Sequence, residues 1–216
     1  MKQIEIREGS IEDAKAIGEL YLKSFPESVE LFFDTNNTAR LNSIAASGFE
    51  LVLRSACLSL TCYDRHSTLL GYCIVSTKNG LPLHRLLIPR NIWKTIRLCL
   101  TSFNKLRIKE LIKLIQNNLC QIRKTGDDTP KKLNGGRIIS IAVHPKARGL
   151  GLGKALLTKA LCFLEKNKVK ATYLEVRPNN LPAKNMYEDV GFYKYGDTQD
   201  LQGPWLRMVR VNNIKE

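Results

Sequence analysis

Residues 143–157 read Val-His-Pro-Lys-Ala-Arg-Gly-Leu-Gly-Leu-Gly-Lys-Ala-Leu-Leu, and this stretch decides the fold. It continues a strongly apolar run, residues 137–144, that predicts a strand, and it leads into a pattern typical of a helix from Gly151 to about Asn167. The first amides of a helix lack partners within the helix and carry partial positive charge. Because glycine lets the backbone approach an anion closely, a glycine-rich turn at this point predicts a phosphate cradle.

The positions of the glycines exclude two nucleotide-binding motifs. A dinucleotide fingerprint, G-x-G-x-x-G, would need glycine at Leu152 or Lys154, and a Walker A loop would need glycine at Arg148 and serine or threonine at Ala155. The pattern that fits is R-x-x-G-x-G, from Arg148 to Gly153. A tight strand-to-helix turn without a ligand would also be rich in glycine, so the glycines alone leave both interpretations open.

A second segment, residues 174–192, reads L-E-V-R-P-N-N-L-P-A-K-N-M-Y-E-D-V-G-F. Together with R-x-x-G-x-G and the preceding I-A-V-x-P, it resembles the GNAT acetyltransferase superfamily, whose segment has the form L-E-V-R-x-x-N-x-x-A-x-x-x-Y-x-x-x-G-F. Within that superfamily it is most similar to the ribosomal-protein-alanine N-acetyltransferases. The resemblance covers about residues 138–192 and implies an α/β GNAT fold, a mixed and mostly antiparallel sheet flanked by helices, as a single domain over residues 1–216.

The resemblance also implies a donor, an acceptor and a set of site residues. Acetyl-CoA is the expected acyl donor, a primary amine is the expected acceptor, and no metal is expected. The matching glutamate, Glu175, is the general base in some members, often through water, and the matching tyrosine, Tyr187, is the general acid toward the CoA sulfur. The other cofactor-binding residues implied, besides Tyr187 itself, are Ile141, Ala142 and Val143 beside the pantetheine arm, Arg148, Gly149, Leu150, Gly151, Leu152, Gly153 and Lys154 around the pyrophosphate, and Asn180.

Several of these residues also have a purely structural interpretation. Glu175 would pair with Arg177 or a lysine at the end of a strand, and Tyr187 would be a core tyrosine with a satisfied hydroxyl. Asn180 would cap the following helix, which is compatible with cofactor binding. His144 follows the apolar strand, and we expect it to be a surface residue rather than a base.

Patterns along the rest of the chain place the other elements. Ser10 resembles a helix N-cap, with Asp13 three residues later near the capping-box position. The expected elements are a strand at 3–7, a helix at 11–24, an irregular helical stretch at 27–48, a hairpin of strands at 58–63 and 69–76, a strand at 171–177, a helix at 181–190, and final strands at 192–195 and 206–211, with a turn at Gly203-Pro204-Trp205 between them.

The formal net charge of +14 is concentrated in one segment, since residues 81–137 hold 13 Lys and Arg against 3 Asp and Glu. Two amphipathic helices with basic outer faces are expected within residues 82–124. Related enzymes usually cross this gap with a short loop, so residues 82–136 are interpreted as a basic helical insertion. It would pack on the domain, dock an acidic partner, or attach to an anionic membrane surface. Nucleic acid is not expected as a partner, because no readout motif is recognised and both aromatic residues, Trp93 and Phe103, lie on apolar faces.

The six cysteines indicate a reducing environment, because none forms a C-x-x-C pair and most lie in apolar stretches. The N-terminus lacks the apolar middle of a secretory signal, and no run of about 18 apolar residues occurs, so a cytoplasmic location is expected. No cysteine lies near the two motifs as a nucleophile, which favours direct transfer in a ternary complex.

The sequence therefore predicts an N-acetyltransferase whose acceptor is a small amine, an amino sugar or a protein N-terminus. Residues 193–205 match poorly the tyrosine-rich stretch of the ribosomal-protein-alanine enzymes, which argues against a ribosomal protein as acceptor. The alternative hypothesis is a non-catalytic CoA-binding scaffold that docks an acidic partner through its basic helices. The presence of Glu175 and Tyr187 weighs against that alternative.

Overall fold

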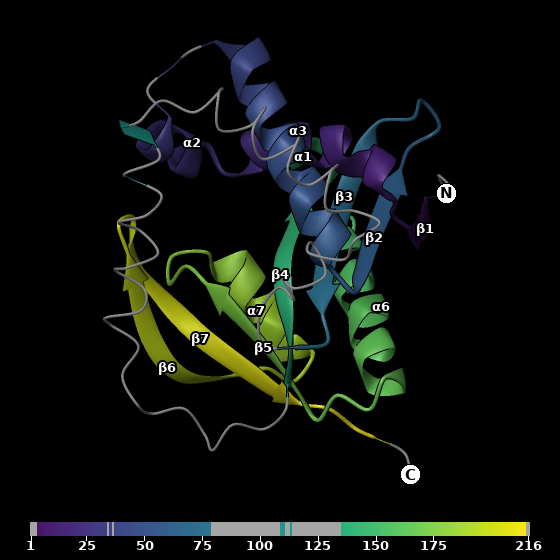
Figure 1. Ribbon diagram of the computed structural model, residues 1–216. Coiled ribbons are helices and arrows are strands. Elements are labelled where there is room, and N and C mark those ends of the chain that lie inside the picture. The colour runs from purple at the N-terminus through teal and green to yellow at the C-terminus, as the bar shows by residue number, and fades with distance from the viewer. Residues whose placement is uncertain are drawn as a thin grey trace, which may run out of the picture.

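The computed structural model describes residues 4–33, 35, 37–78, 109, 110, 113 and 135–214 (Figure 1). Its elements, in chain order, are β1 (Glu5–Glu8), η1 (Ile11–Asp13), α1 (Ala14–Ser24), α2 (Pro26–Phe32), α3 (Thr38–Ser55), β2 (Leu58–Tyr63), β3 (Leu69–Ser76), β4 (Gly135–Val143), η3 (Pro145–Ala147), α6 (Leu152–Lys166), β5 (Ala171–Val176), α7 (Leu181–Asp189), β6 (Tyr193–Asp200) and β7 (Gly203–Val211). The strands form one sheet in the order β1-β2-β3-β4-β5-β7-β6. Within the described part of the chain β4 and β5 pair in parallel and the other neighbours pair antiparallel, which confirms the predicted mixed, mostly antiparallel sheet.

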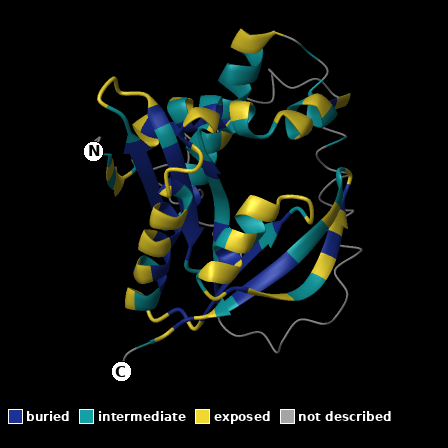
Figure 2. Ribbon diagram, turned by 180° about the vertical axis from the view of Figure 1, so that it is seen from behind, coloured by how far each residue is buried: buried dark blue, intermediate teal, exposed yellow. Residues whose placement is uncertain are grey.

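Helices cover the sheet in two layers. On one face α6 and α7 pack through a cluster that includes Leu156, Leu164 and Tyr187. On the other face α1 and α3 pack against the β3 residues Tyr72 and Ile74, which are both fully buried. Figure 2 shows the buried residues concentrated in the strands, with exposed residues along the outward sides of the helices. Strand β3 is buried along almost its whole length, which explains its continuous apolar sequence, whereas β4 is only partly buried beyond Gly136.

Local polar contacts set the helix boundaries that the sequence indicated. The Ser10 amide donates to Asp13 Oδ2 at 2.7 Å, so the contact expected from the capping-box pattern is confirmed. The irregular stretch divides into α2 and α3, and the Asn37 side chain caps α3 by accepting from the Arg40 amide at 2.9 Å. The hairpin of β2 and β3 has the predicted bounds.

The prediction was wrong at the C-terminal hairpin. Residues 203–205 begin β7 instead of forming a turn, and β6 extends to Asp200. The turn lies at Leu201 and Gln202. The sequence of β6, YKYGDTQD, lacks apolar alternation because only part of this strand is buried, so the pattern favoured a shorter strand.

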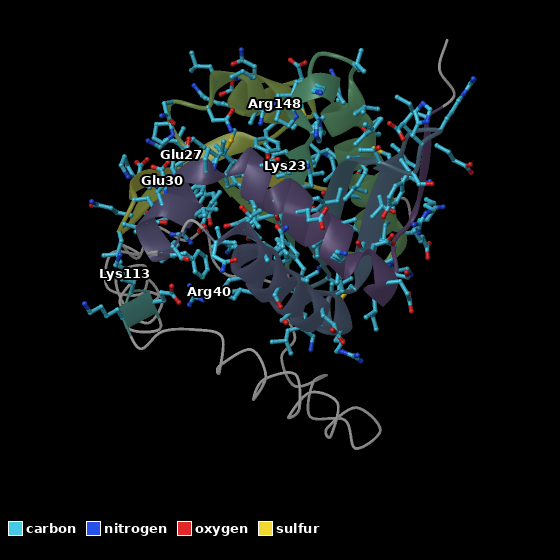
Figure 3. All side chains as sticks on the ribbon, turned by 90° about the horizontal axis from the view of Figure 1, so that it is seen from above. Lys23, Glu27, Glu30, Arg40, Lys113 and Arg148 are labelled. Atoms are coloured by element: carbon cyan, nitrogen blue, oxygen red, sulfur yellow. The ribbon has the colours of Figure 1, made fainter. Side chains whose placement is uncertain are left out.

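Two residues of the segment predicted as a basic insertion contact the helical layer. Lys109, Glu110 and Lys113 are helical, and Arg40 of α3 donates to both carboxylate oxygens of the buried Glu110, at 2.8 and 2.6 Å. The Lys113 ammonium donates to the carbonyl of Leu31, near the end of α2, at 2.8 Å, and Figure 3 shows Lys113 and Arg40 at the same corner of the molecule. The rest of the predicted insertion at 82–136 lies outside the described residues, apart from the start of β4. No helix in the described ranges combines the length and apolar character needed to cross a bilayer.

The sheet opens between β4 and β5, and this opening positions the site. Gly135, Gly136 and Arg137 pair with Ala171, Thr172 and Tyr173, and there the parallel pairing ends. The remaining residues of β4 pair with β3 alone, and the remaining residues of β5 pair with β7 alone. Among the residues that the structure describes, one edge of β4 therefore has no neighbouring strand from residue 138 onward.

Candidate functional site

The glycine-rich turn leaves the start of α6 open. Gly149 and Gly151 have φ values of +80° and +75°, in the left-handed region that favours glycine. A Cβ added at either position would have no atom of a described residue within 4 Å, apart from the adjoining residues of the turn, so the described side chains do not fill this space. Gly151 is the N-cap of α6, and it offers no side chain to cap the first amides of the helix. Such amides point outward and favour an anion.

The third glycine of the turn has a packing role. A Cβ at Gly153 would lie 3.1 Å from Met186 Sδ of α7 and 3.6 Å from Val143 Cγ2 of β4. Glycine therefore lets α6 begin directly against α7 and the end of β4. This packing brings the turn, the end of β4 and α7 together.

Positive charge surrounds the turn. Burial lowers the pKa of His144, and the nearby charges of Lys23, Lys146 and Arg148 lower it further. Figure 3 shows Lys23 and Arg148 on neighbouring elements of this surface. His144 is half-buried, and its Nδ1 accepts from the Lys146 amide at 3.2 Å. The field of these cations adds to the partial charge at the start of α6.

The end of β4 offers backbone groups to the opening. The His144 amide donates to the Leu70 carbonyl at 2.8 Å, and backbone groups alternate in direction along an antiparallel pair. Ala142 therefore pairs with β3, whereas Ile141 and Val143 turn their amides and carbonyls toward the side that β5 has left. Of the three residues predicted beside a pantetheine arm, these two have the backbone direction that the role requires.

Asn180 and Tyr187 lie on α7. The Asn180 side chain accepts from the Ala183 amide at 3.3 Å, so Asn180 caps the helix as one interpretation predicted. Tyr187 is buried, with its ring edge-on to Phe192 at 5.9 Å. Its hydroxyl forms no hydrogen bond with any described residue, so the prediction of a core tyrosine with a satisfied hydroxyl is not supported. Burial raises the pKa of Tyr187, which keeps the hydroxyl protonated at neutral pH.

Glu175 lies on β5 just beyond the last β4–β5 pair. Its carboxylate pairs with Arg137 of β4, with Nη2 and Oε2 2.8 Å apart. The structural alternative that paired Glu175 with Arg177 or a lysine is therefore wrong in its partner. Arg177 instead pairs with Asp200 at 3.0 Å, and its guanidinium lies 3.7 Å from the centroid of the Trp205 ring. The ion pair of Glu175 fixes its carboxylate at the point where the two strands separate.

Three residues near Glu175 were missed by sequence reasoning: Arg137, Tyr195 and Arg207. Arg207 stands opposite Glu175 in the β5–β7 register, and its guanidinium lies 4.7 Å from the centroid of the Tyr195 ring. Burial raises the pKa of Tyr195, and the charges of Arg207 and Arg137 partly offset this rise. Alternation along β7 would have placed Arg207 on the face of Trp205, but the sequence does not fix which strand pairs with β5. In the part of the chain that the structure describes, no three His, Cys, Asp or Glu side chains are grouped to hold a metal ion.

Comparison with known proteins agrees with this arrangement. Residues 119–192 match the Acetyltransferase (GNAT) family. The chain is 42% identical over 60 residues to the ribosomal protein bS18-alanine N-acetyltransferase of Escherichia coli, covering 28% of this chain and 40% of that protein. It is 39% identical over 61 residues to a mycothiol acetyltransferase of Acidothermus cellulolyticus, covering 28% of this chain and 19% of that protein. The chain thus spans less than half of the length of these curated relatives.

The fold is shared over a longer range. The crystal structure of the ribosomal-protein-S18-alanine N-acetyltransferase from Escherichia coli superposes with a TM-score of 0.57 at 15% sequence identity, covering 99% of this chain and 97% of that chain. The predicted fold is therefore confirmed for the sheet and its helices. The chain is therefore similar to the GNAT acetyltransferase family in sequence over the glycine-rich turn and α7, and it shares the fold of this solved acetyltransferase over almost its whole length.

Proposed function

We propose that this chain is an acetyl-CoA-dependent N-acetyltransferase that acts on a primary amine. The observation that carries the proposal is the open start of α6, where Gly149 and Gly151 adopt positive φ and no side chain caps the first amides. This start lies beside the edge of β4 that β5 has left. A diphosphate and the extended arm attached to it fit these two adjacent features.

The donor would be held in two parts. The amides of residues 149–154 would bind the pyrophosphate, with Arg148 and Lys154 adding positive charge at the rim. The pantetheine arm would run along β4 and exchange hydrogen bonds with Ile141 and Val143, as a neighbouring strand would. Asn180 would contact the cofactor from the start of α7. The side chains of Leu150, which is exposed, and Leu152, which is buried, are not needed for these contacts, because their backbone groups serve.

The reaction would be a direct attack of the amine nitrogen on the thioester carbonyl carbon. Glu175 would accept the amine proton, through water where the distance requires it, while a backbone amide at the end of β4 stabilises the developing oxyanion. The carbon–sulfur bond then breaks, and the leaving thiolate takes a proton from the Tyr187 hydroxyl. Burial raises the pKa of Tyr187, so its hydroxyl carries a proton when the thiolate forms, and the proton taken up by Glu175 returns to the tyrosinate through solvent. The products are an N-acetyl amine and CoA.

Calorimetric titration with acetyl-CoA and thiol release over a panel of primary amines test the proposal. We expect binding and turnover in the wild-type chain. Tyr187→Phe and Glu175→Gln should lower kcat while leaving the dissociation constant of acetyl-CoA within about threefold. Binding without turnover on any amine would instead support the non-catalytic CoA-binding scaffold, and the absence of binding would overturn both hypotheses.

A further inference from the structure

One face of the C-terminal half of the sheet carries a row of charged side chains. Glu175 and Arg177 alternate with apolar residues along β5, so they project from the same face. Arg207 stands directly opposite Glu175 on β7, and Trp205 precedes Arg207 by two residues on the same face. Val176, which lies between Glu175 and Arg177 at the end of β5, belongs to the core beneath α6 and α7. The charged row therefore lies on the opposite face from the α6–α7 layer.

Two of the three arginines on this face have acidic partners. Arg137 pairs with Glu175 at 2.8 Å, and Arg177 pairs with Asp200 at 3.0 Å. Arg207 is only 8% exposed, yet among the residues that the structure describes it has no acidic partner within ion-pairing distance. Its guanidinium faces the ring of Tyr195. The row thus contains one more positive charge than negative charges.

An uncompensated buried charge is costly, since it loses hydration without gaining a partner. The ring contact and the side-chain hydrogen bond with Tyr195 offset only part of that cost, because neither supplies a negative charge as an acidic partner would. The nearby hairpin has further unmet hydrogen-bonding capacity: Nε1 of Trp205 and Oγ1 of Thr198 are buried without a partner in the described structure. Thr198 and Trp205 stand opposite each other in the β6–β7 register, so these groups lie next to Arg207 along β7. The buried guanidinium of Arg207 and these neighbouring polar groups could therefore bind an anionic group at this face.

This face also lies on the acceptor side of the opening. Glu175, the proposed base, is the direct cross-strand neighbour of Arg207, and such neighbours have Cβ atoms about 5 Å apart. Ser28 of α2 and Gln202 of the β6–β7 turn exchange hydrogen bonds of 2.9 and 3.3 Å, so α2 approaches the end of the same row. An amine that reaches Glu175 therefore passes beside Arg207.

We propose that Arg207 binds an oxyanion of the acceptor, so that the acceptor is an amine that also carries a carboxylate or a phosphate. This inference rests on the proposed function, because it assumes that the amine is acetylated beside Glu175. The guanidinium of Arg207 binds the oxyanion, whose negative charge neutralises the one positive charge in the row that has no acidic partner among the described residues. Glu175 stays paired with Arg137 and remains able to serve the amine. Acceptors that lack an acidic group leave Arg207 unpaired and are used less well.

The experiment compares matched acceptors in three versions, with the same amine scaffold carrying a carboxylate, a phosphate or a neutral carboxamide. Thiol release from acetyl-CoA gives kcat/KM for each version with the wild-type chain, Arg207→Gln, Arg207→Lys and Lys194→Gln. Lys194 is the matched control, because it lies on the same hairpin, is 52% exposed, and its loss changes the net charge equally. The carboxylate and phosphate arms identify which oxyanion the site receives.

We expect the wild-type chain to prefer one of the acidic acceptors over the carboxamide. Arg207→Gln should lower kcat/KM for that acceptor on the order of 10- to 100-fold, the size expected for a lost charge-assisted hydrogen bond. The carboxamide should change by less than about threefold, Arg207→Lys should retain part of the preference, and Lys194→Gln should retain all of it. The preference is expected in KM more than in kcat.

Equal losses for acidic and neutral acceptors in Arg207→Gln would overturn the inference, as would a wild-type chain that shows no preference for an acidic acceptor. Either result leaves the proposed acetyltransferase activity standing, because turnover is observed. Absence of turnover with every amine in the wild-type chain overturns the proposed function itself, and the two failures are thereby distinguished.

Discussion

Replacing Gly151 with alanine separates the folding role of the turn from its binding role. A left-handed backbone costs an L-residue about 1–2 kcal/mol, and Gly151 has a φ of +75°. Alanine recovers about 0.4–1 kcal/mol by restricting the unfolded chain. No atom of a described residue lies within 4 Å of the added Cβ, apart from the adjoining residues of the turn, so no clash with the described residues adds to the cost. The free energy of unfolding should therefore fall by about 1 kcal/mol.

The binding effect of Gly151→Ala has a different origin. Backbone strain is present in both the free and the bound folded protein, so it cancels in the dissociation constant. The added methyl group occupies the space through which the pyrophosphate approaches the first amides of α6. Loss of one charge-assisted hydrogen bond would raise the Kd of acetyl-CoA by about 10-fold or more.

Urea unfolding and calorimetric titration measure the two effects. Gly191→Ala is the matched control, because Gly191 has a φ of +91° at the end of α7 and a Cβ there would meet Arg210 atoms only at 3.7 Å or beyond. It should lose similar stability and bind acetyl-CoA as the wild-type chain does. If Gly151→Ala bound acetyl-CoA within twofold of the wild-type value, the turn would not be the pyrophosphate site.

Three further changes test the structure. Asp13→Asn should lower the free energy of unfolding by about 2 kcal/mol at pH 7. Burial alone would raise the pKa of Asp13, but hydrogen bonds from Tyr63, Ser10 and Arg7 hold it below its ordinary value. The carboxylate's contribution to stability is therefore complete above about pH 4 and is lost as the pH falls through the folded-state pKa. A difference between variant and wild type that does not narrow in acid would contradict this. Arg40→Met should cost about 3 kcal/mol in urea unfolding, because it removes the ion pair and the two hydrogen bonds that Arg40 makes with the buried Glu110 carboxylate. Adding Glu110→Leu should recover part of that loss, and the absence of any recovery would show that the ion pair is not the cause. Tyr187→Phe should change the free energy of unfolding by less than about 0.5 kcal/mol, because the hydroxyl has no partner among the described residues. The same variant should lose thiol release from acetyl-CoA. A large fall in the free energy of unfolding would instead show that the hydroxyl has a structural role.

The central part of the fold could be predicted because its signals are local. Apolar runs gave β2, β3, β4 and β5, and the glycines at 149, 151 and 153 marked the turn into α6. The cap of α7 by Asn180 and the contact between Ser10 and Asp13 also depend on residues three positions apart or fewer. Such contacts can be predicted from short stretches of sequence, because both partners lie within a few residues of each other.

The acceptor side of the site could not be predicted in the same way. Arg207 and Glu175 are 32 positions apart and meet only because β7 inserts between β5 and β6 in the sheet. Arg137 meets Glu175 because Arg137 forms the last parallel pair with Tyr173, and Glu175 follows Tyr173 by two residues on the same face of β5. These contacts follow from strand order and register, which depend on the packing of the whole sheet rather than on any local pattern. The length of β6 could not be predicted either, because the strand is only partly buried and its sequence therefore lacks an alternation of apolar residues.

In the proposed complex, the acyl donor lies in the opening between β4 and β5 and contributes to the stability of the sheet. A pantetheine arm along Ile141 and Val143 would form hydrogen bonds with main-chain groups that otherwise face water. It would thereby connect β4 and β5, as an additional strand between them would. Amide hydrogen exchange along residues 138–143 should then slow when the donor binds, and the melting temperature should rise with donor concentration as mass action requires. The resistance of the protein to unfolding in a cell would follow the acetyl-CoA supply.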